Sequence, residues 1–110
     1  MTAPRALLCA RLLELPGLEA RRSRCGPDVA FFLEGAEIAH FHADDEIDVR
    51  LTKKVLRINR EALAGDPRVV PRRSASDWVA VRFATAQDAE FAASLVRLAY
   101  EARLARLLPE

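Results

Sequence analysis

The stretch that decides the fold runs from Ala36 to Leu51 and reads AEIAHFHADDEIDVRL. His40 and His42 are separated by one residue, and an acidic run follows them at 44–46. Branched and aromatic residues that alternate with polar ones are typical of strands. The stretch therefore predicts a β-hairpin with strands at 36–43 and 47–51.

The register of this hairpin decides which side chains share a face, because alternate residues of a strand point the same way. A two-residue loop at 44–45 would mix polar and apolar side chains on both faces, whereas a three-residue loop at 44–46 separates them. We therefore expect the second register, which pairs His42 with Asp48, His40 with Arg50, and Phe41 with Val49. Its polar face consists of His40, His42, Asp48 and Arg50.

The flanking sequence supplies the other elements. Periodicity predicts helices at 4–15, 53–64 and 86–107, strands at 18–24, 29–34 and 78–83, and a long irregular loop at 66–77. Thr52 is expected to cap the middle helix, and Thr85 with Asp88 resembles a capping box at the start of the last. The order helix, four strands, helix, strand, helix indicates an α+β domain: a mostly antiparallel five-stranded sheet with helices packed on one face.

Composition limits the class of protein. The 110 residues fit a single domain, 1–110, and 51% hydrophobic content is ordinary for a globular chain. The formal net charge of +1 gives no overall field toward nucleic acid or a membrane surface, and no stretch approaches the roughly 20 apolar residues of a membrane span. Cys9 and Cys25 form no metal spacing or disulfide framework. We expect free thiols, a cytoplasmic location, and neither nucleic-acid nor membrane partners.

The predicted polar face allows four interpretations. His40, His42 and Asp48 could bind a metal ion, or a histidine tuned by Asp48 could act as an acid or base. Alternatively, the histidines with Arg50 and Arg82 could bind an anionic or phenolic molecule, with Trp78 on the same side as Arg82. The fourth interpretation is a solvated or dimer-facing sheet surface with cross-strand pairs. Two arginine groups, at 21–24 and 68–73, lack the interleaved aromatics that base stacking needs.

A family resemblance falls on the same residues. The motif Glu37-Ile38-Ala39-His40-Phe41-His42, the acidic turn, and the strand that begins at Trp78 resemble the luciferase-domain family. This family includes fungal luciferases, which oxidise a hydroxylated pyrone with molecular oxygen and are not known to need a metal or organic cofactor. The resemblance implies His40, His42, Glu37, Asp48 and Trp78 as site positions, and an Asp-Asp pair stands where fungal members carry a further histidine.

Two functional hypotheses follow. The first is a domain that binds a small organic ligand without a cofactor, with oxygenase-like chemistry. Its expected catalytic residues are His40, His42 and Asp48, and its ligand-binding residues are Glu37, Arg50, Trp78 and Arg82. The second is an interaction module without a small-molecule site, which forms a homodimer through a sheet face or the leucine-rich terminal helices.

Overall fold

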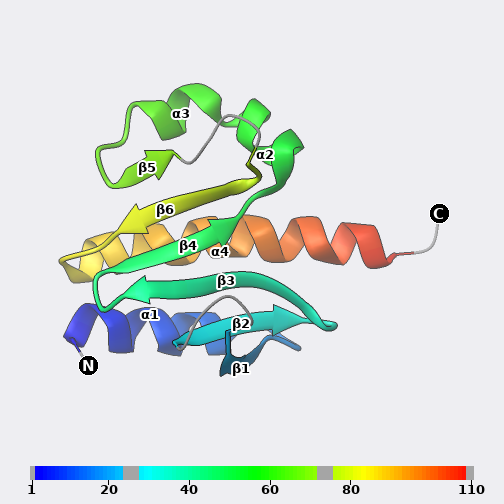
Figure 1. The fold of residues 1–110 in the computed structure, drawn as a ribbon, viewed down its shortest axis with the longest axis horizontal. Helices are drawn as coiled ribbons and strands as arrows, with labels where there is room; N and C mark the ends of the chain where they lie inside the picture. Colours follow the sequence, from blue (N-terminus) through cyan, green and yellow to red (C-terminus); the bar gives the residue numbers. More distant parts are fainter. Residues whose placement is uncertain (1, 24–27, 72–75, 109–110) are drawn as a thin grey trace.

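The computed structural model describes residues 2–23, 28–71 and 76–108, and its main feature is a six-stranded antiparallel sheet (Figure 1). The elements in chain order are α1 (Ala3–Leu13), β1 (Glu19–Arg22), β2 (Val29–Leu33), β3 (Ala36–Ala43), β4 (Glu46–Arg50), α2 (Thr52–Ile58), α3 (Arg60–Ala64), β5 (Val69–Pro71), β6 (Trp78–Arg82) and α4 (Ala86–Leu107). The strands lie in the order β1-β2-β3-β4-β6-β5. The predicted α+β class and antiparallel sheet are confirmed.

Two elements differ from the prediction. The expected irregular loop contains β5, which pairs with β6 at the sheet edge, so the sheet has six strands rather than five. An edge position tolerates proline, because no neighbouring strand requires its missing N–H. The middle helix is divided into α2 and α3 at Asn59, whose side-chain amide donates to the Val55 carbonyl at 2.9 Å. Such side-chain competition for backbone groups explains why asparagine interrupts helices.

The core lies between one face of the sheet and the two longest helices. α1 and α4 run side by side behind the sheet in Figure 1 and contact each other extensively. Phe31 and Phe41 meet edge to face at 5.9 Å between ring centroids, and Phe83 contacts Phe41 at 6.2 Å. The opposite face, turned away from α1 and α4, is called the polar face below.

Strand β3 contains two β-bulges, one at Ile38 opposite β2 and one at His42 opposite β4, and the second of them replaces the expected hairpin register. Ala39 pairs with Val49, His40 with Asp48, and Phe41 with Ile47. All three predicted pairs are therefore wrong: His42 with Asp48, His40 with Arg50, and Phe41 with Val49. His42 is the extra residue of the second bulge, since the next pair joins Ala43 to Glu46 across a two-residue turn. A bulge adds one residue to one strand and shifts its alternation. The extra residue His42 therefore keeps Phe41 on the apolar face, although the turn has two residues instead of the expected three.

Arg5 fastens α1 to the hairpin. Its guanidinium forms ion pairs with Asp28 at 2.7 Å and with Asp44 of the β3–β4 turn at 2.9 Å, and it lies 3.9 Å from the ring centroid of Phe41. Arg5 is buried to 7% exposure, and burial of a guanidinium requires such partners. One residue thus joins the first helix, the start of β2 and the hairpin turn.

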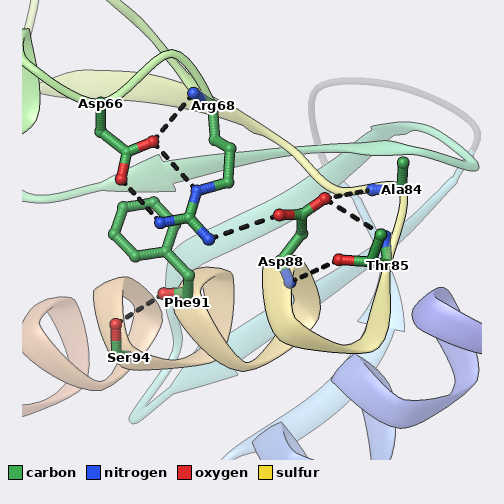
Figure 2. Close-up of polar contacts among 7 residues, drawn as sticks. All are labelled: Asp66, Arg68, Ala84, Thr85, Asp88, Phe91 and Ser94. Carbon is green, nitrogen blue, oxygen red and sulfur yellow. Dashed lines mark hydrogen bonds and ion pairs between the residues drawn. The ribbon is translucent and has the colours of Figure 1, made fainter.

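The N-terminus of α4 carries the predicted capping box (Figure 2). The Thr85 hydroxyl accepts a hydrogen bond from the Asp88 N–H at 3.1 Å, and the Asp88 carboxylate accepts from the N–H groups of Thr85 and Ala84. Arg68 donates to the same carboxylate at 3.3 Å and lies 3.9 Å from the Phe91 ring centroid. This cluster joins the segment before β5 to α4.

The remaining expectations concern the cysteines, the cap at Thr52 and membrane spans. Cys9 is a free, half-buried thiol, whereas Cys25 lies outside the described residues. Thr52 accepts a long hydrogen bond of 3.4 Å from the Val55 N–H. In the described ranges, every helix is too short or too polar to cross a membrane.

Replacing Thr85 with alanine should lower the free energy of unfolding by about 1 kcal/mol, because the Asp88 N–H loses its acceptor. Chemical denaturation measures the change. Thr85→Ser retains the hydroxyl and should remain close to the wild type. Equal destabilisation by serine and alanine would contradict the assigned role of the hydroxyl.

Candidate functional site

The candidate site is built on the polar face from neighbouring positions of β3 and β4. His40 lies directly opposite Asp48 in the antiparallel pair. Glu37 is three residues before His40 and would lie on the other face of a regular strand. The bulge at Ile38 removes that separation, because the β2 partners of Glu37 and His40 are Phe32 and Ala30, two residues apart. Glu37 and His40 therefore share the polar face.

The three side chains form a network that we call the carboxylate–histidine triad. Nδ1 of His40 lies 3.0 Å from Oε2 of Glu37, and Nε2 lies 2.9 Å from Oδ2 of Asp48. The side chains of Glu37 and Asp48 are only 8% and 9% exposed, and that of His40 is 15% exposed. Buried carboxylates are costly unless they are paired and hydrogen-bonded. His40 supplies a partner to both.

The triad favours the protonated imidazole. The hydrogen bond to Asp48 is the largest cause that raises the pKa of His40 above its ordinary value; burial opposes it, and the charges of Asp48 and Glu37 reinforce it. In the imidazolium form, each ring N–H donates to one carboxylate. A neutral ring would instead direct one nitrogen lone pair at a carboxylate oxygen. With His40 protonated, the three side chains together carry one negative charge.

Two further residues contact the triad. The Ser23 hydroxyl donates to Oε1 of Glu37 at 3.0 Å, and Ser23 is buried to 8% exposure. The ring of Trp78 lies 4.9 Å from that of His40 between centroids, tilted by 44°. Since β4 lies between β3 and β6, the indole reaches across β4 to the histidine. Trp78 was singled out from the sequence, whereas Ser23 has no local sequence signal and is found only through the fold.

The other candidate residues lie apart from the triad. His42 is exposed in the second bulge, and the structure does not bring it to His40 and Asp48. Arg50 and Arg82 lie on the polar face, but each forms an ion pair: Arg50 with Asp77 at 2.9 Å, and Arg82 with Glu46 at 3.3 Å. Strict alternation could not show these differences, because the bulge at His42 is not marked by glycine or proline.

A metal centre does not fit this arrangement. Within the described ranges, no group of three His, Cys, Asp or Glu side chains is arranged to hold a metal ion. Both ring nitrogens of His40 face carboxylate oxygens, so neither offers a free lone pair to a cation.

Comparison with known proteins identifies the family. Residues 35–99 match the model of the luciferase domain, which is more than half of the chain, and the chain therefore belongs to the luciferase-domain family. The matched region contains the triad and Trp78 but not Ser23. No curated protein and no solved structure gives a match.

Replacing Asp48 with asparagine should lower the pKa of His40, because the main cause of its elevation is lost. NMR titration should place the wild-type midpoint above about 6.5, the ordinary histidine value. Since the pKa is raised by folding, protonation of His40 stabilises the fold fully below the unfolded pKa. This contribution should disappear as pH rises through the folded pKa.

His42→Gln removes the second histidine signal and allows the remaining signal to be assigned. Asp45→Asn removes a carboxylate from the exposed turn and serves as the matched control. An His40 midpoint at or below the ordinary value, or one unmoved by Asp48→Asn, would contradict the role given to Asp48.

Proposed function

We propose that this luciferase-domain protein binds a small organic molecule with a phenolic or enolic hydroxyl at the carboxylate–histidine triad. The observation that carries the proposal is a histidine held between two largely buried carboxylates. Carboxylates at this depth accept hydrogen bonds strongly, because little water competes for them. A hydroxyl that approaches the triad finds strong acceptors beside a positive charge.

The triad also suggests how the proton of the ligand hydroxyl is removed. Both nitrogens of His40 are engaged, so the base is a carboxylate, Glu37 or Asp48, rather than the imidazole. The hydroxyl proton passes to the carboxylate, and the positive imidazolium stabilises the negative oxygen left on the ligand.

Trp78 supports an aromatic or conjugated ligand. Its indole lies against His40 and provides a flat apolar surface beside the acceptors, and flat rings pack well on such surfaces. Arg50 pairs with Trp78 across β4 and β6 and adds a guanidinium to the same face. These contacts support a planar hydroxylated ring more than a flexible aliphatic acid.

The second part of the proposal is oxygenase-like chemistry on the bound molecule. A deprotonated phenol or enol gives up electrons to molecular oxygen more readily than its neutral form. Proton removal at the triad is then the step that this chain contributes, and the ligand supplies the electrons. The oxidation of a hydroxylated pyrone by fungal members of the family supports this direction.

Exposed leucines favour self-association as a second candidate function. Leu13 closes α1 at 54% exposure, and the end of α4 adds further exposed leucines at positions 104, 107 and 108. Such residues at the ends of adjacent helices are typical of protein contacts. Here the protein would act as a homodimer through its terminal helices.

A panel of phenols and hydroxypyrones, screened by thermal shift, should contain compounds that stabilise the wild-type protein saturably. Asp48→Asn and Glu37→Gln should weaken the binding of these compounds by about 10- to 100-fold, as expected for a lost hydrogen bond to a charged group. His42→Gln and Arg82→Gln are matched controls that should bind normally. Stabilisation that survives both triad substitutions would refute the site, and circular dichroism verifies that each variant is folded.

Sedimentation equilibrium tests the second candidate. The wild-type protein should dimerise with increasing concentration, and Leu104→Ser with Leu107→Ser should shift it to the monomer. Ala105→Ser, in the same turn, is the control and should leave the association unchanged. A wild-type monomer at every accessible concentration would exclude the homodimer.

A further inference from the structure

The segment of α2 and α3 carries four cations that no ion pair joins to another described residue. They are Lys53, Lys54, Arg57 and Arg60, and all four are exposed. Most other described arginines are engaged: Arg5, Arg11, Arg21, Arg50, Arg68, Arg82 and Arg97 each pair with a carboxylate. The two lysines are also the only lysines of the chain. We call these four residues the basic elbow.

The helical geometry collects the cations on one surface. Residues 53, 54, 57 and 58 recur at helical spacing and form the solvent side of α2, while Val55 and Leu56 pack against the core. Ile58 lies among the cations and is 69% exposed. Figure 1 shows α2 and α3 beyond β5 and β6 at the edge of the sheet, and α2 also contacts α4.

A hollow marks the break between the two helices. It has a volume of 480 Å³ and is lined by Arg57, Ile58, Asn59, Arg60, Glu61 and Ala62. Two arginines and two apolar residues, Ile58 and Ala62, therefore border the same depression. Guanidinium groups bind carboxylates in a forked geometry, and an exposed isoleucine favours an apolar contact.

We propose that the basic elbow is a docking site for an acidic segment of a partner protein. Carboxylates of that segment pair with the four cations, and an apolar side chain between them rests on Ile58. The net charge of +1 conceals this surface, because acidic residues elsewhere on the chain balance it. The inference is independent of the ligand proposed for the triad.

Two observations favour an acidic protein segment over a lipid bilayer or a nucleic acid as the partner. Binding to a bilayer grows with the apolar area that is inserted, and here Ile58 is the one large apolar side chain exposed on the described α2–α3 segment. Single-stranded nucleic acid usually binds through aromatic platforms, and the residues that line the hollow include no aromatic.

Fluorescence anisotropy with a fluorescein-labelled peptide of glutamates interrupted by leucines tests the proposal. The full-length protein should bind it, and binding should weaken as salt is added, because exposed ion pairs are screened. Arg57→Gln with Arg60→Gln should weaken binding by about 2- to 30-fold, the range expected for two exposed pairs. Ile58→Ser should weaken it further.

Arg22→Gln with Arg106→Gln is the matched control. It removes the same charge from exposed arginines that also lack an ion pair with another described residue, and it should bind like the wild type. If both double variants lost the same affinity for the peptide, the effect would come from net charge alone, and this result would overturn the site. Wild-type behaviour of Ile58→Ser would overturn the apolar contact.

Two further probes separate the classes of partner. Phosphatidylserine vesicles and a labelled single-stranded oligonucleotide should bind more weakly than the acidic peptide. Either one bound in an Arg57- and Arg60-dependent way, with no binding of the peptide, would overturn the proposal of a protein partner.

Discussion

The polar face depends on the two bulges of β3. Without the bulge at Ile38, Glu37 would point toward α1 and α4 and would bury a carboxylate in the apolar core. Without the bulge at His42, the two-residue turn would exchange the faces of Phe41 and His40 relative to β4. Each bulge interrupts the ladder between β3 and one neighbouring strand. Together, the two bulges keep the apolar side chains on the core face and the triad side chains on the polar face. The same strand therefore supplies core residues on one side and two members of the triad on the other.

The triad has a stabilising role in the fold, and the proposed function adds a chemical role; both depend on the proton of His40. Two buried carboxylates without a cation would repel each other and lose hydration. Protonation of His40 relieves both effects, so the fold favours the charged form of the imidazole and raises its pKa. In the proposed function, a ligand hydroxyl would approach an arrangement whose charges are already in place, which is the condition for electrostatic stabilisation of a developing oxyanion. Ser23, through Glu37, fixes one end of this network.

Much of the fold could be predicted from local patterns. Alternation located the central strands, periodicity located α4, and Thr85 with Asp88 marked its first residue. The register could not be predicted, because an extra strand residue such as Ile38 resembles any other branched residue in sequence. The candidate positions Glu37, His40, Asp48 and Trp78 could be chosen, but period two separates Glu37 from the others. Ser23 and β5 are defined by partners far along the chain, and short-range patterns do not encode such contacts.

The packing of α1 against α4 affects the order of folding during synthesis. These helices lie at opposite ends of the sequence, yet they form adjacent parts of one layer over the sheet. While the ribosome is still producing α4, the apolar side of the hairpin lacks the contacts that α4 makes with β3 and β4. Chains emerge at roughly 5–20 residues per second, so this surface stays open for about a second or more.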